Sequence, residues 1–217
     1  MRYAIPLVLL AALMAMAVGC GGPTGESATV GDAIEETPEE AAKAVEEAVD
    51  AVIYEISDQS YIGWAGSKPL ATHYGQFPSF EGTVSVRDND ITTARVDITF
   101  HMTELSSDDT RLTGVLLDPT WFHVEEYPEA RFTSTSIEED ENSYKVTGNL
   151  EIRGERKSVS FPAEIELDGD QITVFAEFYI DRHAWDIGRG HVEDLVVRNN
   201  VSIELDVIAD HPGEEAA

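Results

Sequence analysis

The side chains best suited to bind a polar group gather late in the chain, within residues 182–198. Arg182, Arg189 and Arg198 lie there, although the chain as a whole has a net charge of -28, and Trp185 lies among them. A guanidinium offers a planar fork of donors that suits a phosphate or a quinone carbonyl, and an indole can stack on a ring. The competing interpretation is that these arginines only neutralise their acidic neighbours, which are Asp181, Asp186, Glu193 and Asp194.

Motifs of the common catalytic classes are absent from the sequence. It contains no Gly-x-Ser-x-Gly elbow, phosphate-binding loop, Gly-x-Gly-x-x-Gly turn or His-Glu-x-x-His pair. The six histidines are scattered, and His183 and His191 lie near acidic residues at a spacing that matches no known metal site. We therefore predict neither a catalytic residue nor a metal ligand, and we interpret this stretch as a polar loop.

The charge balance excludes two classes of partner. Lys and Arg number 14 and Asp and Glu 42, which gives the net charge of -28. Nucleic-acid binding depends largely on the neutralisation of phosphates, so a nucleic-acid partner is excluded. Attachment to an anionic membrane through a basic surface is excluded for the same electrostatic reason. The single Cys rules out an internal disulfide.

The N-terminus predicts export and lipid anchoring. A positive start and an almost wholly apolar run to Val18 are typical of a signal peptide, which we place at residues 1–19. The sequence Ala17-Val18-Gly19-Cys20 resembles a bacterial lipobox, which implies an acylated Cys20 at the mature N-terminus. No Asp follows Cys20, so we expect a protein secreted across the inner membrane and anchored in the cell envelope, facing the periplasm, at the outer membrane. The alternative is an ordinary signal peptide with a Cys near its cleavage site.

Residues 20–50 are predicted to form an acidic tether. Between residues 21 and 50 there are nine acidic residues, one base and no aromatic residue. The first half, rich in Gly, Ser and Thr, is expected to be disordered. In the second half Thr37, Pro38 and Glu40 provide a helix start signal, so a short helix over 38–49 is predicted. We interpret the segment as a spacer that holds the following domain away from the membrane.

From residue 51 to residue 210 the apolar residues alternate, as they do in strands with one buried face. Short turn signals separate the strands, among them residues 87–90, 139–142, 154–156 and 168–170. The predicted fold class is therefore all-β, an antiparallel and largely up-and-down arrangement of eight to nine strands. Successive hairpins favour a closed barrel over two packed sheets. Residues 211–217 are left as a tail.

The interior of such a barrel can hold either side chains or a small ligand. Small inward residues at Ala94, Gly148, Ala163 and Ala176 favour a tunnel, whereas a solid core with small residues opposite large ones is the alternative. Residues 108–127 break the alternation and predict a short helical plug or lid at one mouth, or a cover for a sheet edge. The candidate tunnel-lining residues are Trp64, Phe80, Phe100, Trp121, Phe122, Phe132, Leu150, Phe161, Ala176 and Phe178.

Several ordered blocks resemble the YceI-like proteins, over about residues 52–209. The blocks are Ser60-Tyr61-Ile62-Gly63-Trp64, Thr72-His73-Tyr74-Gly75-Gln76-Phe77, Phe80-Glu81-Gly82, Tyr127-Pro128-Glu129-Ala130-Arg131-Phe132-Thr133-Ser134-Thr135, Tyr144-Lys145-Val146-Thr147-Gly148-Asn149-Leu150 and Phe178-Tyr179-Ile180-Asp181-Arg182. The resemblance implies a lipocalin-like barrel with an apolar tunnel. It also implies a long-chain amphiphilic ligand, such as an isoprenoid quinone, a polyprenyl phosphate or a fatty-acid derivative.

The prediction is therefore a lipid-binding protein of the cell envelope that sequesters or carries its ligand. The candidate contacts for the ligand's head group are His73, Arg182, Trp185 and Arg189. No cofactor is expected apart from a bound isoprenoid lipid or quinone, and the expected partners are the lipid and the membrane, with a homodimer left open. The alternatives are a structural or stress-related envelope protein with a filled barrel and, third, a lipid-modifying enzyme.

Overall fold

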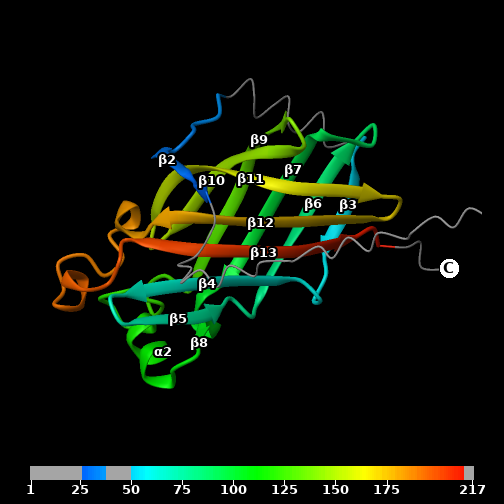
Figure 1. The fold of residues 1–217 in the computed structure, drawn as a ribbon. Coiled ribbons are helices and arrows are strands. Elements are labelled where there is room, and N and C mark those ends of the chain that lie inside the picture. The colour runs from blue at the N-terminus through cyan, green and yellow to red at the C-terminus, as the bar shows by residue number, and fades with distance from the viewer. Residues whose placement is uncertain (1–25, 38–49, 213–217) are drawn as a thin grey trace, which may run out of the picture.

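The computed structural model describes residues 26–37 and 50–212. The predicted signal peptide, Cys20, the predicted helix at 38–49 and residues 213–217 lie outside the described residues. Eight antiparallel strands form a closed ring (Figure 1), which confirms the predicted all-β, eight- to nine-stranded barrel. The ring consists of β3 (Val52–Ile56), β6 (Phe80–Arg87), β7 (Asp90–His101), β9 (Glu129–Asp140), β10 (Ser143–Ile152), β11 (Glu155–Asp168), β12 (Gln171–Asp181) and β13 (Asn200–Asp210).

Two ladders close the ring. The strands β12 and β13 pair along their whole length, from Gln171 opposite Asp210 to Asp181 opposite Asn200. The far end of β13 pairs with β3, where Ala209 lies opposite Ile56. Closure satisfies the backbone groups that an open sheet would expose at its edges.

The tight turns follow the local sequence signals. Asp88 and Asn89 both have positive φ values, of 54° and 56°, and they join β6 to β7 where Arg87 pairs with Asp90. Arg153 and Gly154, with φ values of 54° and 74°, join β10 to β11 in the same way. Two consecutive residues with positive φ are typical of the hairpin turn whose twist matches that of the flanking strands.

A second group of short elements covers one end of the barrel. It consists of β4 (Tyr61–Lys68), β5 (Ala71–Gln76), β8 (Ser106–Ser107), η1 (Met102–Glu104), α2 (Thr110–Leu117), η2 (Arg182–Trp185) and η3 (Glu193–Leu195). The strand β4 pairs with β13, and the β4–β5 hairpin projects from the barrel at the same end as α2 (Figure 1). The helix α2 begins after Asp109, whose carboxylate accepts the backbone N–H of Leu112 at 2.9 Å. The predicted helical lid is thus present at one mouth.

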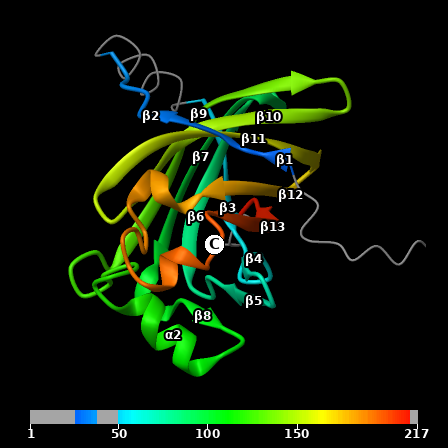
Figure 2. The same ribbon diagram turned by 60° about the vertical axis from the view of Figure 1, so that its left-hand side comes forward.

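The first part of the predicted tether is a piece of the barrel wall. The strands β11 and β12 pair only from Glu164–Asp168 to Gln171–Phe175 and then separate. Between them lie β2 (Thr29–Asp32), antiparallel to β11, and β1 (Glu26–Ser27), parallel to β12 (Figure 2). The expectation of disorder is therefore wrong for these residues. The composition of the segment alone does not reveal that two strand edges supply its hydrogen-bonding partners.

Asn149 on β10 fastens the chain just beyond this inserted segment. Its side-chain oxygen accepts the backbone N–H of Ile34 at 2.8 Å, and its side-chain nitrogen donates to the Ile34 carbonyl at 2.9 Å. The Asn149 side chain is buried in this contact. No helix within residues 26–37 and 50–212 has the length and apolar character that a membrane crossing requires.

Replacement of this amide tests the attachment of the inserted segment. We expect Asn149→Leu to leave both Ile34 backbone groups without their partners, at a cost of about 1–3 kcal/mol. Hydrogen exchange should then speed up at the amides of residues 29–34. Asn142→Leu, at the exposed β9–β10 turn, is the matched control and should leave these rates unchanged. Unchanged protection in Asn149→Leu would show that the side chain does not hold the segment.

Candidate ligand-binding cavity

The barrel encloses a cavity of about 150 Å³ whose lining side chains are all apolar. Every one of the eight barrel strands contributes to it, because the inward residues of each strand are aliphatic or aromatic. A single water needs roughly 10–15 Å³ of such space, and apolar cavities of this size are dry. The lining is Ile56, Ile62, Phe77, Val84, Ile91, Ala94, Val96, Ile98, Phe100, Met102, Phe122, Ala130, Phe132, Ile137, Val146, Leu150, Ile152, Val159, Phe161, Ile165, Ile172, Val174, Phe178, Ile180, Ile203, Leu205 and Val207.

The small inward residues serve two different purposes. Ala94 lines the cavity, as the tunnel prediction requires. Gly148 instead accommodates the ring of Phe132, since a Cβ atom at Gly148 would lie 2.5 Å from that ring. Phe161 stacks on Phe178 with 4.2 Å between ring centroids. The interior is thus partly a packed core and partly a cavity.

A second cavity, of about 430 Å³, lies at the mouth under α2. Its walls come from the β4–β5 hairpin, α2 and residues 182–203. Five residues line both cavities, so the two adjoin at a shared apolar neck: Phe77, Phe122, Ile152, Ile180 and Ile203. Unlike the interior, the mouth carries polar and charged side chains, which are Ser67, Lys68, His73, Asp109, Arg111 and Arg182. An apolar channel that ends in a polar rim matches the shape of an amphiphile.

His73, a predicted head-group contact, lines the mouth and is held by Asp108. The His73 Nδ1 lies 2.9 Å from an Asp108 carboxylate oxygen. This hydrogen bond, with a second from the backbone N–H of Tyr74, holds the pKa of Asp108 below its ordinary value. The pair joins β5 to the chain that precedes α2.

Arg182, the second predicted contact, also lines the mouth cavity, but its guanidinium donates to groups of the protein itself. Its side chain is 3% exposed and forms an ion pair with Asp194. Its guanidinium also donates to the carbonyl of Ile187 at 2.6 Å and to the carbonyls of Val197 and Arg198 at 3.3 Å. Arg182 therefore organises the loop that forms one wall of the mouth.

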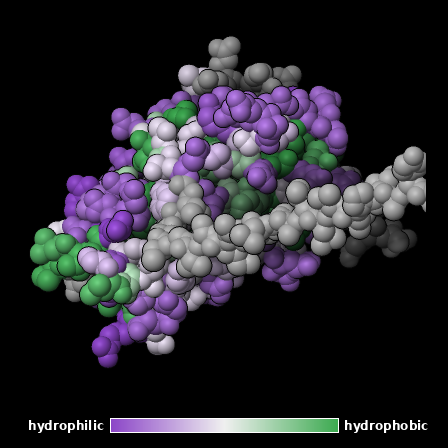
Figure 3. Space-filling model, viewed as in Figure 1, coloured by the Kyte–Doolittle hydropathy of each residue, from purple (hydrophilic) through white to green (hydrophobic). Residues whose placement is uncertain are grey.

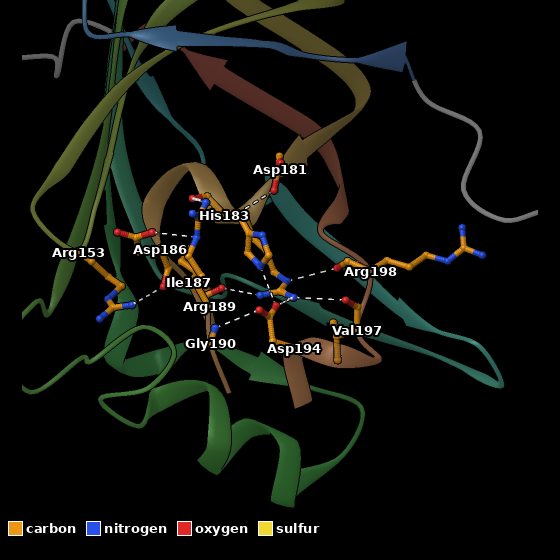
Figure 4. Close-up of polar contacts among 11 residues, drawn as sticks. Arg153, Asp181, His183, Asp186, Ile187, Arg189, Gly190, Asp194, Val197 and Arg198 are labelled. Atoms are coloured by element: carbon orange, nitrogen blue, oxygen red, sulfur yellow. Dashed lines mark hydrogen bonds and ion pairs between the residues drawn. The ribbon is translucent and has the colours of Figure 1, made fainter. Parts of the chain in front are cut away.

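Asp194 is the acidic centre of this loop. Its carboxylate accepts the backbone N–H of Gly190 at 3.0 Å, the guanidinium of Arg182 and a contact from His183 at 2.7 Å (Figure 4). These three contacts, with the Gly190 N–H the largest, hold the pKa of Asp194 well below its ordinary value. The ionised Asp194 therefore stabilises the folded protein. This contribution is complete above about pH 3.9, the pKa of the carboxyl group in the unfolded chain, and is lost as the pH falls through its lower pKa in the folded protein.

The other two predicted head-group contacts lie outside both cavities. Trp185 is fully buried, and its indole N–H donates to the carbonyl of Leu150 at 3.1 Å. Arg189 is exposed, pairs with Asp186 at 3.0 Å and donates to the carbonyl of His183. Both residues hold the loop together, and the ion pair of Arg189 agrees with the interpretation that the arginines of this stretch neutralise their acidic neighbours.

Eight of the ten predicted tunnel residues line one cavity or the other, and Phe80 and Ala176 line neither. Phe80 packs on Phe100 with 6.0 Å between ring centroids, and Ala176 is buried in the wall. Lys68 and Arg111 also line the mouth and are not among the residues predicted from the sequence. Arg111 lies within the segment predicted as a lid and could have been found there, whereas no signal placed the β4–β5 hairpin at the mouth.

Among the described residues, no three His, Cys, Asp or Glu side chains converge as metal ligands.

Comparisons with known proteins place this arrangement in a family. A family model described as the YceI-like domain matches residues 54–209. The protein YceI of an Escherichia coli strain is 30% identical over 97 residues, which are 45% of this chain and 51% of that protein. The chain thus matches about half the length of the curated relatives.

Solved structures share the fold. The crystal structure of Burkholderia cenocepacia BcnA has a TM-score of 0.66 at 23% identity, covering 70% of this chain and 98% of that one. A structure described as a polyisoprenoid-binding domain from Saccharophagus degradans has a TM-score of 0.60 at 14% identity, covering 75% and 99%. At these identities the likeness establishes the architecture, a lipocalin-like barrel.

Two arginines of the same loop give a matched test of its construction. We expect Arg182→Met to lower the free energy of unfolding by about 2 kcal/mol or more, because it leaves the carbonyls of Ile187, Val197 and Arg198 without their donor. Arg189→Met removes an exposed ion pair and should change the free energy of unfolding by no more than about 1 kcal/mol. Denaturant unfolding of both variants measures the difference. Equal effects would contradict the structural role assigned to Arg182.

Proposed function

This chain belongs to the YceI-like domain family, and on that basis we propose that it binds a long-chain amphiphilic lipid in its barrel. The observation that carries the proposal is the wholly apolar cavity that adjoins a polar mouth through a shared neck. Each methylene group removed from water contributes about 0.8 kcal/mol, so a long chain binds such a cavity without elaborate polar recognition.

The mouth favours a ligand with an anionic head. Lys68 and Arg111 line it and are exposed, while the guanidinium of Arg182 is already occupied by protein groups. Asp109, the acidic residue in the same lining, caps α2. A phosphate or carboxylate placed there meets two cations. A polyprenyl phosphate or a fatty-acid derivative therefore fits this mouth better than a neutral isoprenoid quinone.

We propose a carrying or sequestering role in the cell envelope, as the lipobox-like sequence before Cys20 suggests. The acyl chains on Cys20 would hold the protein at the membrane from which its ligand comes. The lipobox and the family membership support this role independently of each other. Catalysis is not part of the proposal, because binding alone accounts for an apolar cavity with a charged rim.

Lipid anchoring is tested by labelling. We expect cells given radiolabelled palmitate to incorporate it into the wild-type protein, because Cys20 becomes the acylated N-terminus. Cys20→Ser should abolish the label and move the protein out of the membrane fraction. A wild-type protein that remains unlabelled would contradict the anchor.

Ligand binding is tested by native mass spectrometry of gently purified protein, followed by lipid extraction. We expect a long-chain lipid bound to the wild-type protein. Ala94→Phe should place a ring in the cavity and reduce the bound lipid at least tenfold, since displacing two methylenes costs about 1.6 kcal/mol. Because it fills existing space, the variant should lose less stability than the 1–3 kcal/mol typical of overpacking.

Thr173→Phe is the matched control for this experiment. Thr173 is the neighbour of the cavity-lining residues Ile172 and Val174 on β12 and is absent from the lining. The same ring on the other face of the strand should leave the bound lipid unchanged. A wild-type protein without lipid that also fails to take up added fatty acid would contradict the proposal and favour a structural barrel.

A further inference from the structure

The most exposed large apolar side chains gather at the mouth end of the molecule. Leu70 is 98% exposed, Leu195 is 85% exposed and Val192 is 79% exposed, which are the three highest values among the described large apolar residues. Val196 and Val115 add to them. We call these five residues the mouth patch. Figure 3 shows hydrophobic side chains gathered at the left-hand end, where Figure 1 places the loop of residues 190–198.

The mouth patch comes from three elements that surround the opening. Leu70 lies in the β4–β5 turn, Val115 on α2 and the other three in the loop of residues 190–198. The backbone N–H of Arg198 donates to the Ser67 carbonyl at 2.8 Å, which joins the loop to the hairpin. Val115 of the mouth patch lines the mouth cavity, as do Lys68 and Val197, which lie beside the patch in the hairpin and in the loop. The mouth patch is thus continuous with the entrance to the interior.

The charges at this end differ from those of the whole chain, whose net charge is -28. Asp194, Asp186 and Asp108 are each engaged by a neighbouring cation or histidine. The side chain of Arg198 instead extends outward, with its guanidinium at no drawn contact in Figure 4. Lys68 and Arg111 are exposed at the rim. Lys68, Arg111 and Arg198 therefore flank the mouth patch together with one exposed carboxylate, Asp109, although acidic residues predominate in the sequence.

From these features we propose that the mouth patch docks on the surface of a lipid bilayer. Exposed aliphatic side chains on a convex end insert among acyl chains, and the flanking cations lie at the depth of the phosphate groups. A bilayer in this position abuts the mouth, so a lipid chain passes between membrane and cavity without crossing water. A second copy of the chain on this surface would instead block both mouths. The proposal goes beyond ligand binding, and its test needs no ligand in the cavity.

The test measures how the chain without its predicted signal peptide, residues 20–217, partitions onto phosphatidylcholine vesicles in a flotation assay. Every protein carries Cys20→Ser, so that no acyl chain contributes and all variants share one N-terminus. We expect Leu70→Ser with Leu195→Ser to lower the partition coefficient at least tenfold, because two leucines no longer insert. As a control, Ile53→Ser with Phe175→Ser removes two exposed apolar side chains from the barrel wall and should leave the partition coefficient unchanged.

A fluorescent label gives an independent reading. An environment-sensitive dye on Val192→Cys should shift to the blue with vesicles, whereas the same dye on Ile53→Cys should not.

Equal partition of the two double variants, or equal dye shifts at the two positions, would overturn the proposal. Loss of self-association without a change in vesicle binding would also overturn it and assign the mouth patch to a second copy. Native mass spectrometry of the same variants reports ligand content separately. A failure of docking is therefore distinguishable from a failure of the proposed function.

Discussion

Closure of the backbone ladder around an apolar interior is the constraint on which this structure depends. The eight strands pair around the ring, and β1 and β2 fill the place where β11 and β12 separate, so each strand can present an apolar face inward and a wet face outward. Inward aromatic residues at 132, 161 and 178 pack against one another and leave a cavity beside them. The direct pairing of the ring strands is interrupted where β11 and β12 separate. The segment of residues 26–32 occupies that place, and Asn149 holds the chain that follows it.

The mouth is stabilised differently from the barrel, because ion pairs and hydrogen bonds between charged and polar groups hold its loop together. Arg182 is buried among the carbonyls of its own loop, and its partner Asp194 receives two further contacts. The guanidinium also lies 5.4 Å from the ring centre of Trp121, which joins the loop to the chain after α2. The loop that these contacts fasten lines the cavity beneath a short helix. It also leaves Lys68 and Arg111 available to a ligand at the rim.

Much of the barrel could be predicted because alternation reports directly on a strand with one buried face. The strands over 90–101, 143–152 and 171–181 repeat it for many residues, and their turns carry local signals. The strand of residues 71–76 and the inserted segment of residues 26–32 have no such pattern. They form because other strands offer them an edge. The site could be predicted less well, as Trp185 shows. Its residue type suggested a surface on which a ligand ring stacks, whereas in the fold it is buried and its indole N–H donates to the Leu150 carbonyl.

The central claim, that an apolar chain enters the barrel, is tested most directly by titrating a series of fatty acids and fatty alcohols of increasing chain length. If the chain lies in the cavity, each added methylene should tighten binding about fourfold, the equivalent of about 0.8 kcal/mol, until the cavity is filled. Binding should then level off, and at low salt the acid should bind more tightly than the alcohol of equal length, because Lys68 and Arg111 face its head. An affinity that does not depend on chain length would contradict the account.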